Sequence, residues 1–165
     1  MLSELLTKCS VCGQQIIFKP GENLARCPWC DRINERPKCA PEETELMKYA
    51  NERRNMGEFK EAEEAYRKVL QACTEEHEAR WGILLCKYGV LYVESAEGRD
   101  RVITCRRART SSFRSEPDYQ IVLGQASPEI RAAYEKDAAY IDRVQTEIQK
   151  LKAQTEPYDV FLCYK

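Results

Sequence analysis

The chain has 165 residues, 43% of them hydrophobic, which is enough for one or two small folded units. Its formal net charge of −1 argues against a generic nucleic-acid-binding protein, which would usually be clearly basic. Residues 1–8 lack the apolar run of an export signal, and no stretch reaches the length of a membrane span. Nine cysteines in a chain without an export signal lead us to expect a reducing, cytoplasmic setting.

Two Cys-x-x-Cys turns near the start of the chain form the strongest motif, with 14 residues between them. Brought together, two such turns make a closed tetrahedral thiolate site of the kind that favours zinc. Because cysteine fills every position, no coordination site is left for water, so we expect a structural zinc rather than a catalytic one. The predicted ligands are Cys9, Cys12, Cys27 and Cys30.

Other interpretations of the cysteines are weaker. A thioredoxin-like redox motif would have one Cys-x-x-Cys beside a βαβ pattern, and a disulfide framework would need an oxidising compartment. Redox sensing through labile zinc thiolates needs exposed, reactive sulfurs, which a sequence does not show. The five remaining cysteines are expected as small buried hydrophobes or bystanders, although Cys39 lies close enough to the motif to replace a ligand.

The segment between the cysteine pairs predicts one β-hairpin. Residues 14–19 read as a strand, residues 20–23 as a turn, and residues 24–26 as the returning strand. Residues 1–38 are thus predicted to be a zinc ribbon, which is too small to fold without the metal. Its aromatic residues, Phe18 and Trp29, would either stack on nucleobases or cover the metal site, and we favour the cover because no basic face accompanies them.

Residues 42–93 predict a helical centre. Two glutamates at 42–43 suit the first turn of a helix, residues 55–58 break the pattern, and Phe59 opens a second helix. A third apolar stretch covers residues 79–89.

Part of this centre looks like the second half of a tetratricopeptide repeat followed by the opening of the next copy. About one and a half repeats are covered, too few for an extended peptide-binding groove, so we expect a plain helical core. The only histidine, His77, lies in a glutamate-rich link and is expected at the surface. The residues that carry the resemblance are Gly57, Phe59, Ala62, Tyr66 and Leu70, then Ala79 and Trp81.

An arginine-rich insertion is predicted at residues 94–116, with a short hairpin between residues 91–94 and 101–105. Because guanidinium groups match phosphate oxygens, Arg106, Arg107 and Arg109 are candidate anion-binding residues. We favour the alternative, in which the arginines pair with the acidic surplus of residues 42–64 or form a solvated loop.

The C-terminal third predicts two helices. Residues 115–118 have the form of a helix start with a serine cap, and this short helix ends near Gly124. Residues 127–129 start a long helix whose apolar stripe should pack on the helical centre; a dimerising stalk is the alternative. Asp137 interrupts the near-heptad spacing of that stripe. The stripe consists of Ile130, Tyr134, Ile141, Val144, Ile148 and Leu151.

Residues 158–165 have strand chemistry and closely resemble the opening strand of Toll/interleukin-1 receptor (TIR) domains. Only Cys163 departs from the common pattern, at a position where serine is usual. Residues 80–82, 85–89, 92–94 and 104–106 look like the region upstream of TIR domains in bacterial multidomain proteins, which also begin with a zinc ribbon. The resemblance implies an N-terminal accessory region that ends at the first TIR strand.

Some TIR domains cleave the nicotinamide–ribose bond of NAD with a glutamate well downstream of that strand, outside residues 1–165. We therefore expect no catalytic residue here, and we find no Ser/His/Asp set and no phosphate-binding glycine loop in the sequence. The expected function is a non-catalytic regulatory or scaffolding module that contacts a protein partner or a second copy. The alternative is a zinc-ribbon nucleic-acid adaptor that uses residues 99–114.

The fold predicted from these patterns is mainly α. It consists of a small β zinc ribbon at residues 1–38, a tetratricopeptide-like helical module at residues 42–153 that ends in a long helix, and the start of a TIR domain at residues 158–165.

Overall fold

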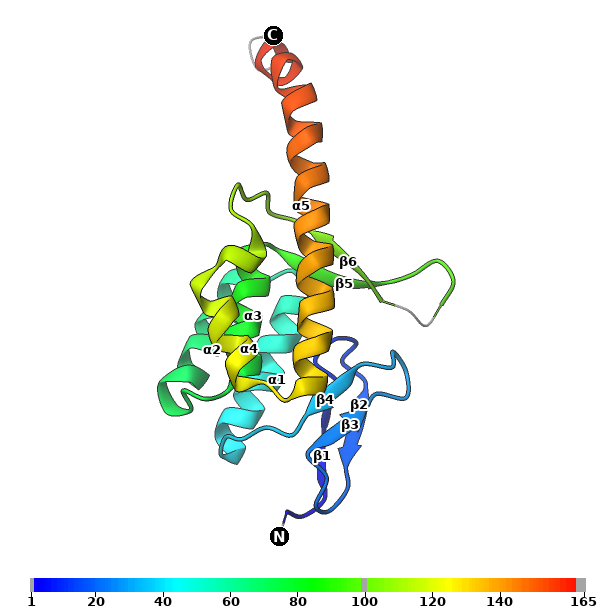
Figure 1. Ribbon diagram of the computed structural model, residues 1–165, viewed down its shortest axis with the longest axis vertical. Helices are drawn as coiled ribbons and strands as arrows, with labels where there is room; N and C mark the ends of the chain where they lie inside the picture. The colour runs from blue at the N-terminus through cyan, green and yellow to red at the C-terminus, as the bar shows by residue number, and fades with distance from the viewer. Residues whose placement is uncertain (1, 99–100, 163–165) are drawn as a thin grey trace.

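The computed structural model describes residues 2–98 and 101–162, the last eight of these by their backbone alone. Two small hairpins lie at the N-terminal end, helices form the body, and one long helix runs along the body and rises beyond it (Figure 1). In this part of the chain, no helix is long and apolar enough to cross a membrane.

The N-terminal unit is built from two antiparallel hairpins. Strand β1 (Leu5–Lys8) pairs with β2 (Gln15–Phe18), and β3 (Leu24–Arg26) pairs with β4 (Ile33–Glu35). The prediction of one hairpin within residues 14–26 is therefore wrong, because each cysteine turn is itself the tip of a hairpin.

Three helices follow as predicted: α1 (Pro41–Asn55), α2 (Phe59–Ala72) and α3 (His77–Lys87). Helices that are neighbours in sequence pack against each other. The approach of α2 to α3 is especially close at Gly82, where an added Cβ would lie 2.3 Å from the Tyr66 ring. A residue without a side chain is therefore needed at this crossing.

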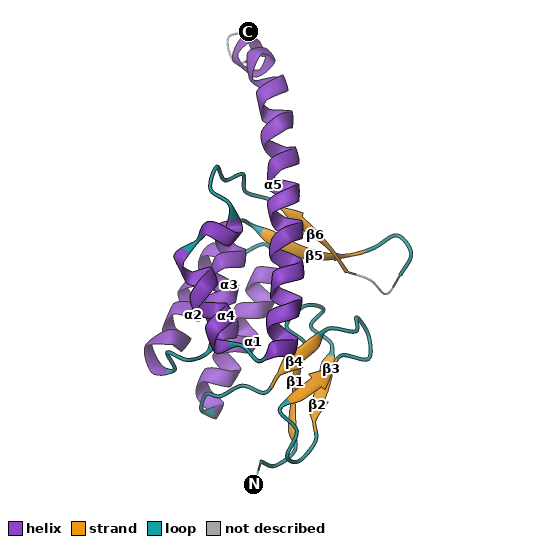
Figure 2. Cartoon of the chain, in the orientation of Figure 1, coloured by secondary structure: helices purple, strands orange, loops and turns teal. Residues whose placement is uncertain are grey.

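The predicted insertion contains a hairpin of β5 (Val90–Glu94) and β6 (Arg101–Cys105), and β6 packs against α5 (Figure 2). A short 3-10 turn (Phe113–Ser115) then leads into α4 (Pro117–Gln125). The predicted serine cap, Ser115, belongs to the 3-10 turn, and the residue after it takes the N-cap position without a side-chain cap.

Helix α5 (Pro128–Leu162) is longer than expected. Its first half supplies Ile130, Tyr134 and Ile141 to the main core, whereas its second half rises from the body (Figure 1). The strand predicted at residues 158–165 is wrong for 158–162, which continue α5, and 163–165 lie outside the described residues. A lone strand would leave its backbone groups unpaired, while a helix satisfies them locally.

The predicted fold class, mainly α with a zinc ribbon, is also wrong: the fold is mixed α and β. Three two-stranded sheets contribute to it within the described residues (Figure 2), and the N-terminal hairpins share a core with the helices. Leu24 and Ile33 pack on the main core, and Tyr92 packs on both the main core and the core of the hairpins.

Candidate metal centre

The two cysteine turns repeat one backbone pattern. In each turn, the first cysteine donates its N–H across the hairpin at 2.8 Å. Gly13 donates back to the carbonyl of Cys9 at 3.0 Å, and Asp31 donates in the same way to Cys27 at 3.0 Å. Both closing residues have left-handed backbones, with φ of 75° at Gly13 and 65° at Asp31. The two matching turns therefore place their cysteine sulfurs around one common site.

The four cysteine sulfurs lie within 4.8 Å of one another. The Sγ atoms of Cys9 and Cys30 are 3.7 Å apart, and those of Cys12 and Cys27 are 3.5 Å apart. A zinc tetrahedron with bonds of about 2.3 Å to sulfur has edges of about 3.8 Å. This cluster therefore has the donors and the spacing to hold a metal ion.

The thiols of the four-cysteine cluster change one another's acidity. The hydrogen bond from the Cys30 thiol lowers the pKa of Cys9 to about 5, while the same contact raises the pKa of Cys30. Burial raises the pKa of Cys12 to about 11. The thiols do not all ionise at neutral pH by themselves, so a divalent cation is what allows four thiolates to lie together.

The first cysteine turn is bonded to the helices through a buried arginine. Arg54 on α1 is 2% exposed and donates to the carbonyl of Ser10 at 2.7 Å and to the Tyr66 hydroxyl at 3.1 Å. Ser10 in turn donates from its N–H and its hydroxyl to Asn34 Oδ1, and Asn34 Nδ2 lies 3.6 Å from the sulfur of Cys9. These bonds hold the four-cysteine cluster against α1 and β4.

The second cysteine turn is bonded to α5. The Arg32 guanidinium, next to the turn, donates to the Asp137 carboxylate at 2.7 Å, and the Tyr92 hydroxyl donates to the same oxygen at 2.8 Å. Both members of the ion pair are largely buried. Asp137, the polar interruption of the predicted stripe, is therefore an anchor for this turn.

His77 is buried, not at the surface as predicted. Its Nε2 lies 2.6 Å from Glu35 Oε2, and its Nδ1 lies 3.0 Å from the Tyr134 hydroxyl. Burial raises the pKa of Glu35, but the hydrogen bond and charge interaction with His77, together with the Ser127 N–H and the charge of Lys38, outweigh it and hold that pKa below its usual value. The histidine begins α3 at the point where β4 and α5 meet, so it links all three elements.

Of the two ribbon aromatics, only Phe18 fits the predicted cover. It is fully buried and packs with the cysteines of the cluster, whereas Trp29 is 61% exposed.

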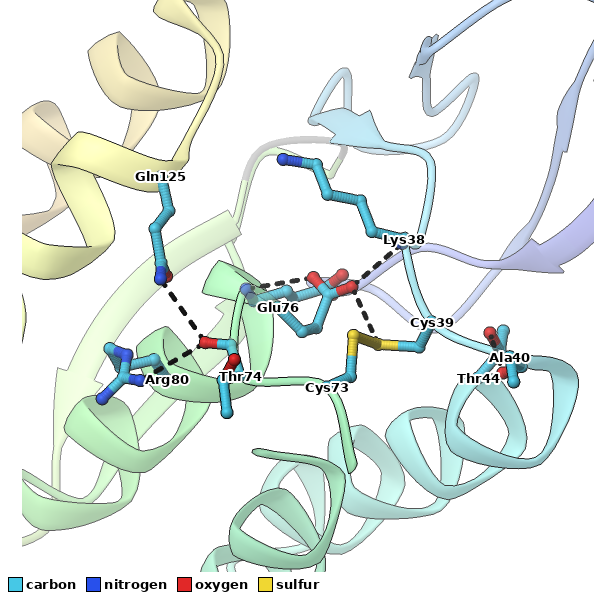
Figure 3. The surroundings of a disulfide bond; sticks show 10 residues. Lys38, Cys39, Ala40, Thr44, Cys73, Thr74, Glu76, Arg80 and Gln125 are labelled. Carbon is cyan, nitrogen blue, oxygen red and sulfur yellow. Dashed lines mark hydrogen bonds between the residues drawn. A yellow bond between two sulfur atoms is a disulfide. The ribbon is translucent and has the colours of Figure 1, made fainter. Parts of the chain in front are cut away.

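Cys39 is not a ligand of the four-cysteine cluster. It forms a disulfide with Cys73, so the expectation that these two residues are buried hydrophobes or bystanders is wrong (Figure 3).

Sequence reasoning missed Arg54, the Arg32–Asp137 pair and the Cys39–Cys73 pairing. The helical spacing of Arg54 with Met47 and Ala50 places it on the buried face of α1, and this signal could have shown its burial.

The guanidinium N–H groups of Arg107 and Arg109 donate hydrogen bonds to the last carbonyls of α3, at 3.1 and 3.0 Å. Arg106 is exposed. Within the described residues, no arginine of the insertion forms an ion pair with residues 42–64; Arg114 pairs with Asp142 on α5 instead. Anion binding by the first three arginines stays a prediction.

Comparison of the chain with protein families, curated proteins and solved structures finds no match. The tetratricopeptide and TIR resemblances therefore gain no support from these comparisons.

Proposed function

We propose that this chain is a non-catalytic scaffolding module that holds a structural zinc ion and associates through α5. The observation that carries the proposal is the pair of anchors between the cysteine turns and the helices, Arg54–Ser10 and Arg32–Asp137. They join the metal cluster to the elements that fix α5. A metal bound there would stabilise the whole body and hold the long helix in place.

Zinc is the ion that suits this cluster best. Four cysteine ligands at tetrahedral spacing form a closed site, and such sites stabilise a fold rather than activate water. Binding free energies of about 10–16 kcal/mol are common for comparable zinc sites. The two hairpins, with three or four residues in each strand, gain from such a contribution.

The second half of α5 supplies the contact. It carries apolar side chains at Val144 and Ile148, which are half-buried, and at Leu151, which is 60% exposed. The spacing of four and then three residues is that of a two-stranded coiled coil. Most helical stability in proteins comes from the packing of an apolar face, so a second copy that covers this edge would stabilise the helix further.

Light scattering after size-exclusion chromatography tests the association. We expect wild-type protein to form a dimer as its concentration rises, and Ile148→Glu/Leu151→Glu to remain monomeric with its zinc retained. Thr146→Glu is the matched control, because it adds a glutamate on the opposite face of α5 and should dimerise normally. A wild-type protein that is monomeric at every concentration would contradict the proposal, as would hydrolysis of NAD by the purified chain.

The accessory role in a bacterial TIR-domain protein is the finer part of the proposal, and it rests on the sequence resemblance alone. The helical backbone at 158–162 gives it no support. The reading frame beyond Lys165 tests it directly. A TIR domain encoded there would support this role, and any other continuation would remove it.

A further inference from the structure

A second group of metal-binding side chains lies where the linker before α1 meets the turn between α2 and α3. Cys39 from the linker and Cys73 from the end of α2 form a disulfide, and the Glu76 carboxylate lies beside it (Figure 3). One ligand atom from each of the three residues can be chosen so that all lie within 4.8 Å of one another. None of the three belongs to the four-cysteine cluster.

Glu76 is a buried carboxylate at the N-cap of α3. It is only 3% exposed, its Oε2 accepts the N–H of Lys38 at 3.1 Å, and its Oε1 accepts the N–H of Glu78 at 3.3 Å. Among the described residues, no cationic side chain forms an ion pair with it. Buried carboxylates are normally paired with a cation or bound to a metal.

The hydrogen-bonding and metal-binding capacity of the Cys39 sulfur, next to Glu76, depends on whether the disulfide is reduced. Glu76 Oε2 lies 3.4 Å from Cys39 Sγ. In the disulfide this sulfur has no proton to donate, so the carboxylate faces two sulfurs without a hydrogen bond from either. In the reduced protein, both sulfurs become thiolate donors directed at the same space as the carboxylate.

We propose that reduced Cys39 and Cys73, together with Glu76, form a second zinc site, which the disulfide closes. In a zinc tetrahedron, bonds of about 2.3 Å to sulfur and 2.0 Å to oxygen give a sulfur–oxygen edge of about 3.5 Å. The 3.4 Å distance to Cys39 matches this edge. The two sulfurs need only rotate apart to about 3.8 Å, and a fourth position stays open for water.

The exchange between the two states balances with a disulfide oxidant such as oxidised glutathione. The zinc-bound thiolates of Cys39 and Cys73 lose two electrons, and a bond forms between their sulfurs. The glutathione disulfide takes these electrons and two protons to become two glutathione thiols, and zinc leaves as a free ion. The site would release zinc under oxidising conditions and take it up under reducing ones.

Counting tightly bound zinc in each redox state tests this site, with the metal measured after dialysis and the disulfide by mass. Wild-type protein should hold two zinc ions per chain under reductant and one after treatment with oxidised glutathione. Cys73→Ser should hold one in both states. Cys105→Ser, which replaces a free cysteine elsewhere, is the control and should behave as wild type. Glu76→Gln should still form the disulfide but bind the second zinc at least about tenfold more weakly.

One zinc in both redox states of the wild-type protein would overturn the inference, as would a second zinc retained by Cys73→Ser. Cys39→Ser repeats the test if Cys73→Ser does not fold. Failure of the proposed structural site is distinguishable, because Cys9→Ser removes a zinc ion only from the first cluster.

Discussion

Gly82 lies on α3 under the Tyr66 ring, with no space for a side chain. Gly82→Ala should therefore destabilise the protein by about 1–3 kcal/mol through overpacking, measured by urea unfolding. Gly124→Ala is the matched control, since it lies in α4 with nothing within 4 Å of an added Cβ. It should be neutral or stabilise by up to about 1 kcal/mol. Equal effects of the two substitutions would refute the close approach of α2 to α3.

Glu78 should make stability depend on pH. Burial raises the pKa of this carboxyl to about 7, and the charge of Glu76 adds to the effect. The unfolded chain loses this proton near pH 4.3 and the folded chain near pH 7, so stability should fall as pH rises between these values. Glu78→Gln should remove this slope and gain roughly 2 kcal/mol over wild type at pH 8. Glu75→Gln, at an exposed position, should follow the wild-type curve in urea unfolding.

At the scale of residues, the sequence identified side chains whose chemistry depends on local spacing. The two Cys-x-x-Cys turns are of this kind, and the structure brings all four of their sulfurs together. His77 was misjudged because its burial depends on β4 and α5, which lie far from it in the sequence. The pairing of Cys39 with Cys73 is missed for the same reason, since 34 positions separate them.

At the scale of elements, the ion pair between Arg32 and Asp137 should contribute strongly to the free energy of unfolding. Asp137→Ala leaves the mostly buried Arg32 guanidinium without its carboxylate and should destabilise the protein by about 3 kcal/mol. Thermal unfolding measures the loss, with Glu135→Ala at an exposed position on the same helix as control. If Asp137 only interrupts a dimer contact, its removal would instead strengthen self-association, and light scattering would show it.

Helices were predictable because their apolar spacing is a local signal. Residues 41–55, 59–72 and 77–87 form the three expected helices, and the breaks between them carry glycine and polar residues. Strand pairing was less predictable, since residues 15–18 pair with the strand before the first cysteine turn rather than with the strand ahead of the second. Strand prediction failed at residues 158–162 for a related reason, because a strand-like composition does not supply a partner strand.

At the scale of the whole molecule, the four-cysteine cluster lies where the hairpins, α1 and α5 converge. Tyr92 on β5 packs on both the main core and the core of the hairpins, and its hydroxyl donates to Asp137. Loss of the metal should therefore loosen elements that do not touch it. The first half of α5 should respond together with the hairpins.

Hydrogen exchange of the zinc-loaded and zinc-stripped protein tests this account most directly, with the Cys39–Cys73 disulfide kept oxidised in both samples. We expect one zinc per chain in the loaded sample, and removal of zinc should speed exchange across residues 24–35 and 128–141 together, by about tenfold for each 1.4 kcal/mol of lost stability. Protein that binds no zinc would contradict the account. Faster exchange confined to the cysteine turns, with α5 unchanged, would contradict it as well.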